Sequence, residues 1–277
     1  MQKQTNAPCL KSAKIKRALI MLTTLFLTAS AICQQRFLWP DNKKCAIVLT
    51  YDDGLSSQLQ TAIPQLDSAR LNGTFFLTGN LTEKTIVQWR NAARNGHELG
   101  NHSLYHPCPA SLYEQHPHFV SDSYDRYSII REIGVMNTVL HLIDQKSTRT
   151  YAYPCSETSV NGMDYADTLQ TTRLVKYARI GGDASSVITE FKKLDGLKVP
   201  SWGISNKPNG RQLIDFVKQV QLAGGLGVLM FHGVGGDYID VSAAAHRDLI
   251  RYLQQHTDIW VGTFQEVMDY ITAANKN

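Results

Sequence analysis

Short apolar runs alternate with segments of helical periodicity along most of the chain. The runs at residues 45–51, 74–77 and 227–231 are too short for helices and nearly free of polar side chains, which is typical of parallel strands buried on both faces. Between such runs, apolar residues recur every three or four positions, for example from Ile129 to Ile143, as on one face of a helix. The pattern therefore predicts strands and helices in alternation.

About eight strands, with helices between most of them, can be placed in this way. Such alternation favours parallel strands joined by right-handed crossovers, so we predict one α/β domain, a distorted (β/α) barrel of seven to eight parallel strands. In a barrel, chemistry gathers at the carboxyl ends of the strands. The expected strands cover residues 45–51, 74–77, 98–100, 150–153, 174–178, 197–199, 227–231 and 259–261, and the expected helices cover about 57–71, 82–95, 129–143, 212–222, 243–255 and 264 onward.

The N-terminus has the pattern of an export signal. Basic residues at positions 14–17 precede an apolar run over residues 18–27, and the small residues 29–31 suit a signal peptidase. The apolar run is shorter than the roughly 20 residues that span a membrane. We therefore predict a signal peptide over residues 1–31, a barrel over residues 36–277, no later membrane span, and a periplasmic or extracellular protein.

Two alternatives for the N-terminus remain open. Cys33 is a candidate for lipid attachment, but Ile32 before it is bulky where a small residue is expected. An uncleaved membrane anchor is the other alternative.

The net charge of +4 does not indicate a nucleic-acid partner. Residues 1–31 contain five basic residues and no acidic one, which leaves 23 basic and 24 acidic residues in the rest of the chain. The basic balance belongs to the predicted signal, so no polyanionic partner is implied.

Candidate metal ligands and proton carriers follow three of the predicted strands. Asp52 and Asp53 end the first, where one carboxylate can bind a cation while the other stays available; an ordinary acidic turn is the alternative. His102 and His106 are spaced to converge on one ion, and neutral imidazoles suit zinc; two surface histidines are the alternative. His232 ends a third strand, where a general acid or a structural histidine would fit.

Together the three motifs resemble the polysaccharide deacetylase family, carbohydrate esterase family 4. The motifs are Tyr-Asp-Asp-Gly at 51–54, Asn-His-Ser-Leu-Tyr-His at 101–106 and Leu-Met-Phe-His at 229–232, and the resemblance extends from about residue 44 to residue 270. The family implies an enzyme that removes acetyl groups, N-linked or O-linked, from an oligo- or polysaccharide. A cyclic amide or imide hydrolase, or a non-catalytic glycan-binding protein on a decayed scaffold, is the alternative.

The resemblance also implies roles for individual residues. Asp53, His102 and His106 would bind one divalent ion, zinc by ligand type, with cobalt, nickel or manganese as alternatives. Asp52 would be the general base and His232 the general acid. The backbone N–H of Cys155, in the third motif with Tyr153, would hold the oxyanion.

This chain departs from the family pattern at several positions. Ala152 occupies the place of an arginine that pairs with the catalytic aspartate, and Arg149 or Arg179 could replace it. Asp183 and Asp195 are the candidates for orienting His232. Two further expectations concern the rim of the site, where Trp202 would line the pocket and a Cys108–Cys155 disulfide would fasten the long loop after His106.

Overall fold

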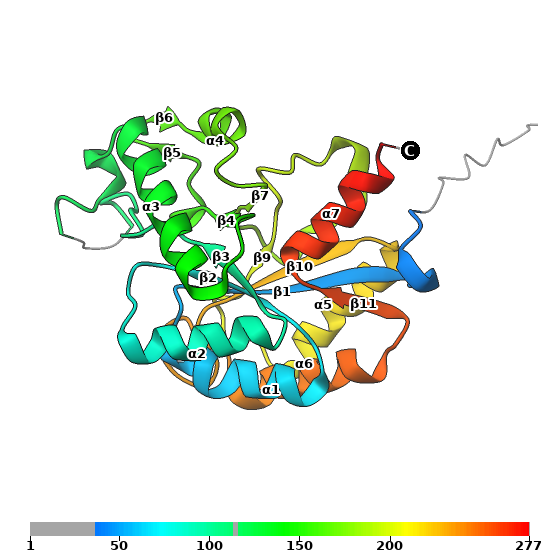
Figure 1. The fold of residues 1–277 in the computed structure, drawn as a ribbon. Coiled ribbons are helices and arrows are strands. Elements are labelled where there is room, and N and C mark those ends of the chain that lie inside the picture. Colours follow the sequence, from blue (N-terminus) through cyan, green and yellow to red (C-terminus); the bar gives the residue numbers. More distant parts are fainter. Residues whose placement is uncertain (1–36, 113–115, 277) are drawn as a thin grey trace, which may run out of the picture. The chain divides into compact units, whose positions relative to one another are not determined.

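A mostly parallel sheet forms the centre of the structure, a computed structural model that describes residues 37–112 and 116–276 (Figure 1). The predicted signal peptide and Cys33 lie outside the described residues. The nine strands follow the order β7-β4-β3-β2-β1-β10-β8, with β11 on β1 and β9 on β10, and only β8 is antiparallel to its neighbour. The strands are β1 (Cys45–Asp52), β2 (Thr74–Leu77), β3 (Glu98–Asn101), β4 (Thr150–Ala152), β7 (Tyr177–Arg179), β8 (Val187–Ile188), β9 (Trp202–Gly203), β10 (Leu226–Phe231) and β11 (Ile259–Gly262).

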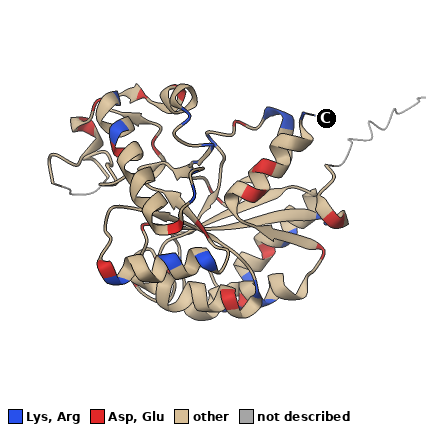
Figure 2. Ribbon diagram, in the orientation of Figure 1, with Lys and Arg blue, Asp and Glu red and all other residues tan. Residues whose placement is uncertain are grey.

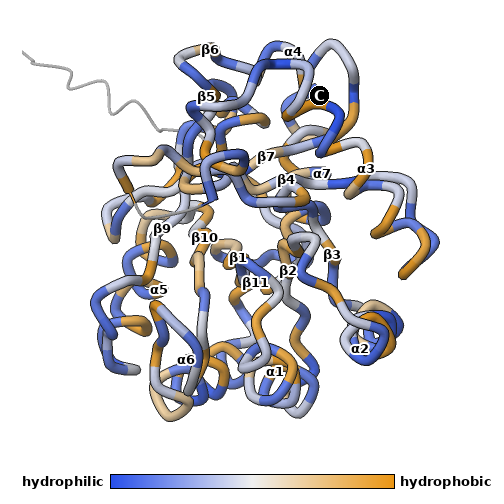
Figure 3. Tube along the Cα trace, turned by 90° about the vertical axis from the view of Figure 1, so that its left-hand side faces the viewer, coloured by the Kyte–Doolittle hydropathy of each residue, from blue (hydrophilic) through white to orange (hydrophobic). Residues whose placement is uncertain are grey.

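Helices surround this curled sheet, as Figure 3 shows for α1, α2, α5 and α6. The prediction of a distorted (β/α) barrel is therefore confirmed. Charged residues lie mainly on the helices and loops, while the central strands carry few (Figure 2). The helices are α1 (Ile63–Ala69), α2 (Glu83–Arg94), α3 (Arg126–Asp144), α4 (Ala166–Thr172), α5 (Gly210–Ala223), α6 (Ala243–Gln255) and α7 (Phe264–Ala274), and a π-helical turn, η2 (Gln58–Ala62), precedes α1.

A short segment nearly closes the barrel between its two edges. Val199 forms a parallel bridge to Arg179 at the end of β7, and β9, three residues later, pairs with Leu229 and Met230 of β10. The predicted strand at 197–199 is wrong in extent, because residues 195–198 form a turn and only Val199 pairs. The connection holds the first and last parts of the sheet together at the end where the candidate site lies.

The strand β1 separates two apolar cores. All of its residues are buried, and alternate side chains point to opposite faces. Ile47, Leu49 and Tyr51 belong to the core that includes residues of α1, α5 and α6, whereas Ala46 and Val48 belong to the core that includes residues of α7. Burial on both faces explains the unbroken apolar run from which the strand was predicted.

Residues 155–200 contain several elements that the sequence did not predict, and the strand expected at 174–178 is observed as β7 at Tyr177–Arg179. A small hairpin pairs β5 (Ser159–Val160) with β6 (Met163–Asp164), and α4 follows it. These elements are short, so they present too few residues for a periodic pattern.

Among the described residues, no helix combines the length and the apolar character that crossing a membrane requires.

A buried histidine supports the strand that carries the candidate carboxylates. His246 of α6 is fully buried; its Nε2 lies 2.7 Å from the hydroxyl of Tyr51, and its Nδ1 lies 2.7 Å from Oε1 of Gln65. Because the glutamine oxygen can only accept, Nδ1 carries the proton and Nε2 accepts from the tyrosine. Burial lowers the pKa of His246 from 6.5 to about 3, so the folded protein holds this imidazole neutral.

We expect His246 to make the fold acid-sensitive. Its folded-state pKa lies below the ordinary value, so its contribution to stability is complete above pH 6.5 and is lost as the pH falls toward 3. One proton taken up on unfolding lowers the free energy of unfolding by about 1.4 kcal/mol per pH unit. Urea unfolding between pH 7 and 5 should show a shallower pH dependence in His246→Gln than in the parent. The exposed His141→Gln is the matched control, and an equal slope in all three proteins would contradict the expectation.

Candidate functional site

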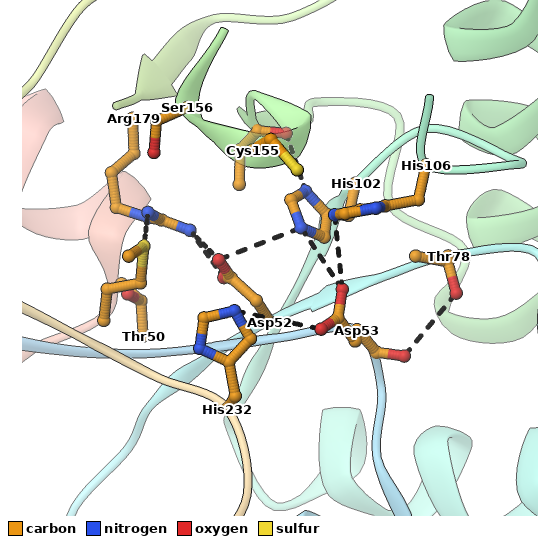
Figure 4. A network of polar contacts seen from close by, with 12 residues as sticks. Thr50, Asp52, Asp53, Thr78, His102, His106, Cys155, Ser156, Arg179 and His232 are labelled. Atoms are coloured by element: carbon orange, nitrogen blue, oxygen red, sulfur yellow. Dashed lines mark hydrogen bonds and ion pairs between the residues drawn. The ribbon is translucent and has the colours of Figure 1, made fainter. Parts of the chain in front are cut away.

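Side chains from four strand ends meet at one rim of the barrel (Figure 4). Asp52 ends β1, and Asp53 follows it directly. His232 follows β10, His102 follows β3 and Arg179 ends β7. The carboxyl ends of parallel strands share one edge of a sheet, which is why residues far apart in the sequence come together here.

Asp53, His102 and His106 form a cluster suited to a divalent metal ion. Oδ1 of Asp53 lies 3.4 Å from Nε2 of His102 and 3.5 Å from Nε2 of His106. Two ligands bound at 2.0–2.1 Å to a tetrahedrally coordinated zinc ion lie about 3.4 Å apart. The donor types and their spacing therefore fit one metal ion, with positions left for further ligands.

The ring nitrogens of both histidines are oriented for metal binding. Nδ1 of His102 donates to the carbonyl of Ala152 at 2.8 Å, which leaves the Nε2 lone pair facing Asp53. Nδ1 of His106 contacts the sulfur of Cys108 at 3.7 Å. Burial, together with the nearby charge of His102, lowers the pKa of His106 to about 4, so this imidazole is neutral near pH 7.

A tight backbone turn brings the two imidazoles together. Ser103 and His106 adopt positive φ angles of 62° and 53°, which non-glycine residues rarely take. The side chain of Asn101 accepts from the Ser103 N–H at 2.7 Å, and the Ser103 hydroxyl accepts from the His106 N–H at 3.0 Å. Asp53 itself has φ of 76°. Such conformations gather at functional sites, where surrounding contacts hold them.

The second carboxylate, Asp52, is held by a buried arginine. Arg179 donates from Nη2 to Oδ1 and Oδ2 of Asp52 at 2.5 and 2.6 Å, and both side chains are buried. Burial raises the pKa of Asp52, but the charges of Arg179, His102 and His232 outweigh it and the net pKa lies below the ordinary value. Asp52 is therefore an ionised carboxylate at the floor of the site.

Strand register explains how Arg179 replaces the missing motif arginine. Ala152 of β4 is paired directly with Arg179 of β7, so the guanidinium starts one strand away from the position where the family motif would place it. The guanidinium lies 5.1 Å from the ring centre of Phe76. Arg149, the other candidate, pairs instead with Asp144.

His232 faces the cluster without a carboxylate behind it. Its Nε2 lies 3.9 Å from Oδ2 of Asp53, and its buried Nδ1 has no hydrogen-bond partner among the residues that the structure describes. The expected orienting residues do not serve: Asp183 accepts from Ser185, and Asp195 accepts from the N–H of Leu197. Gln58 instead donates to the His232 carbonyl at 3.1 Å, which fixes the backbone but not the ring.

A cavity of about 860 Å³ opens over these groups. The expected Tyr153 and Cys155 line it, but Trp202 does not, because its ring packs on Phe216 with centroids 5.0 Å apart. The cavity is also lined by the exposed Tyr105, which belongs to the motif at 101–106, and by residues that no sequence pattern indicated, including the exposed Tyr238. Its lining comprises Asp52, Asp53, Leu55, Thr78, Asn80, His102, Tyr105, His106, Leu112, Tyr153, Cys155, Ser156, Met230, His232, Tyr238 and Ile239.

A disulfide between Cys108 and Cys155 connects two loops of the rim, with Cα atoms 5.7 Å apart. Cys108 follows the metal-site turn by two residues, and Cys155, with φ of 51°, lies on the cavity wall after β4. The bond thereby fixes the loop after His106 against the candidate oxyanion-binding segment. Cys45 is buried in the core and is not part of this disulfide.

Comparisons with known proteins indicate the same family as the sequence motifs. The sequence profile described as Polysaccharide deacetylase matches residues 40–174. The chain is 32% identical over 72 residues to the peptidoglycan-N-acetylmuramic acid deacetylase PdaA of Bacillus subtilis, covering 26% of this chain and 27% of PdaA. It is 33% identical over 102 residues to the peptidoglycan-N-acetylglucosamine deacetylase of Bacillus cereus, covering 36% and 34%. The matches thus span about a quarter to a third of the length of these curated relatives.

A solved structure is similar over more of its length. The peptidoglycan deacetylase PdaC from Bacillus subtilis superposes with a TM-score of 0.56 at 17% identity, covering 86% of this chain and 95% of that one. At this identity the likeness concerns the fold.

We expect the disulfide to contribute substantially to stability. Closing a loop between residues 47 positions apart removes chain entropy worth about 4 kcal/mol from the unfolded state. The double variant Cys108→Ser/Cys155→Ser should therefore have a free energy of unfolding about 4 kcal/mol lower and unfold at a lower urea concentration. The parent protein unfolded with and without a dithiol reductant provides the control, and equal midpoints would contradict the expectation.

We expect Arg179 to be required for burial of the Asp52 charge. Arg179→Ala leaves a buried carboxylate without its partner, which costs about 3–5 kcal/mol of folding free energy. Adding Ala152→Arg should recover part of that loss, because the two positions are in register on neighbouring strands. Urea unfolding at pH 7 measures both effects. If the double variant is no more stable than Arg179→Ala alone, an arginine at position 152 cannot replace Arg179 as the partner of Asp52.

Proposed function

This chain belongs to the polysaccharide deacetylase family, and we propose that it is a metal-dependent hydrolase that removes acetyl groups from a carbohydrate. The observation that carries the proposal is the convergence of Asp53, His102 and His106 beside the ionised Asp52, at the floor of an open cavity. Three ligands with remaining open positions are typical of catalytic rather than structural zinc sites.

Asp53, His102 and His106 would hold the metal ion, which we take to be zinc, with cobalt, nickel or manganese as substitutes. A divalent ion bound there polarises a carbonyl and lowers the pKa of a water molecule. All three side chains supply the required donor atoms on the cavity side of the turn.

Asp52 and His232 would move the protons. Asp52 is held ionised by Arg179, and we propose that it accepts the proton of the water that attacks the acetyl carbonyl. His232 lies across Asp53 from the two ligand histidines (Figure 4), on the side from which a leaving amine or alkoxide can be protonated. Arg179 holds the Asp52 carboxylate, and Gln58 holds the backbone of His232.

We propose that the backbone N–H of Cys155 stabilises the oxyanion. Cys155 lies on the cavity wall, and its backbone has a positive φ angle within a turn that begins at Pro154. The disulfide to Cys108 holds this turn in place. A backbone donor of this kind contributes about 3–4 kcal/mol to the stabilisation of a transition state in other hydrolases.

The substrate that we propose is an acetylated oligo- or polysaccharide outside the cytoplasm. The open cavity suits a chain that lies across it, and the two curated relatives are named as deacetylases of peptidoglycan sugars. We propose further that residues 1–31 are a cleaved signal peptide and that residues 36–277 form the catalytic domain. Export would place the enzyme where polymeric glycans are found.

Acetate release from purified residues 34–277 tests the function. N-acetylglucosamine oligomers and acetylated xylan should release acetate with zinc or cobalt, and a chelator should abolish release. Because general base catalysis contributes about 100- to 10,000-fold, Asp52→Asn should lower the rate by that factor. Asp183→Asn, which changes an exposed carboxylate bonded to Ser185, is the matched control.

Two outcomes would contradict the proposal in different ways. One metal ion per chain with no acetate release from any substrate would indicate a glycan-binding role. Absence of bound metal after dialysis against zinc would mean that Asp53, His102 and His106 do not form a metal site.

A further inference from the structure

A tyrosine outside the recognised motifs contacts the candidate metal ligand Asp53. The hydroxyl of Tyr238 donates to Oδ2 of Asp53 at 2.8 Å. Tyr238 lines the cavity, and its side chain is 54% exposed. The hydrogen bond thus connects an exposed tyrosine to a nearly buried carboxylate of the candidate metal site.

The two oxygens of Asp53 have different neighbours. Oδ1 lies 3.4 and 3.5 Å from the Nε2 atoms of His102 and His106, so it is the oxygen that shares an ion with them. Oδ2 accepts the hydrogen bond from Tyr238 and lies 3.9 Å from Nε2 of His232. The hydrogen bond therefore occupies the oxygen that would otherwise be available as a second donor to the same ion.

The loop that carries Tyr238 is fastened at both ends. Gly233 donates its N–H to the Tyr238 carbonyl at 3.2 Å, and the N–H of Val241 returns to the Gly233 carbonyl at 3.0 Å. Asp237 accepts from the backbone N–H of Ser57 at 2.7 Å, which connects the loop to the segment after β1. These bonds fix the position of Tyr238 relative to Asp53.

Backbone conformation on either side of Tyr238 indicates that its position is enforced. Asp237 has φ of 62° and Ile239 has φ of 47°. The left-handed region is unfavourable for a β-branched residue such as isoleucine and persists only where surrounding contacts hold it. The two strained residues direct the side chain between them toward the cluster.

We propose that Tyr238 is a positioning residue of the metal site, an inference that rests on the proposed function. Its hydroxyl holds Oδ2 of Asp53 so that the carboxylate presents Oδ1 alone to the ion. A carboxylate that binds through one oxygen leaves more of the coordination sphere for water and substrate, which a catalytic site requires. Partners that orient ligands in this way are worth about 10- to 100-fold in metal affinity or activity.

Zinc affinity of Tyr238→Phe, measured by competition with a chromogenic chelator, tests the inference. The variant keeps the ring and removes only the donor, so we expect zinc to bind about 10- to 100-fold more weakly. Tyr127→Phe is the control, because Tyr127 is an exposed tyrosine of α3 that does not line the cavity, and the zinc affinity of this variant should equal that of the parent. The visible absorption of the cobalt-loaded protein should shift in Tyr238→Phe and not in Tyr127→Phe.

Activity at two zinc concentrations separates positioning from a general loss of structure. Acetate release by Tyr238→Phe should be low at limiting zinc and largely restored at saturating zinc. If the parent binds zinc and releases acetate while Tyr238→Phe has unchanged zinc affinity and an unchanged cobalt spectrum, the inference is overturned and the proposed function stands. If the parent binds no zinc, the proposed metal site fails together with the inference.

Discussion

The ion pair between Asp52 and Arg179 crosses the mouth of the barrel, from the end of β1 to the end of β7, four positions away in the sheet. A buried carboxylate without a countercharge would lose a proton only at great cost, or would draw water into the core. The arginine removes that conflict and fixes both oxygens at once. Because the two strands lie on opposite sides of the curled sheet, the same contact also sets the width of the site.

The other reactive groups are arranged around that fixed carboxylate. Nε2 of His102 lies 3.8 Å from Oδ2 of Asp52 and 3.4 Å from Oδ1 of Asp53, so one imidazole lies beside both neighbouring aspartates. The adjacent residues point differently because Asp53 leaves the strand with a positive φ angle and Gly54 follows with φ of 65°. A residue other than glycine at position 54 would be strained at that φ. The different orientations of the two consecutive carboxylates thus originate in one turn of the backbone.

Much of the fold and the site was predictable because the relevant signals are local. The composition of residues 45–51 indicates a buried strand, and Asp53, His102 and His106 lie where strand ends meet in any barrel of this kind. The contact of Tyr238 with Asp53, by contrast, joins residues 185 positions apart through an irregular loop. The choice between Arg149 and Arg179 needed the register of β4 against β7, which no periodicity in the sequence encodes. The short elements between residues 155 and 200 are likewise set by tertiary contacts.

The disulfide makes the geometry of the candidate site depend on whether Cys108 and Cys155 have been oxidised. Its two sulfurs come from the loop after the candidate ligand His106 and from the turn proposed to bind the oxyanion. The rim of the site is complete only once this bond has formed, so a chain made in a reducing compartment would carry the candidate ligands before the loop and the turn are joined. Recombinant production in a reducing cytosol and in an oxidising compartment would then yield the same polypeptide without and with this disulfide.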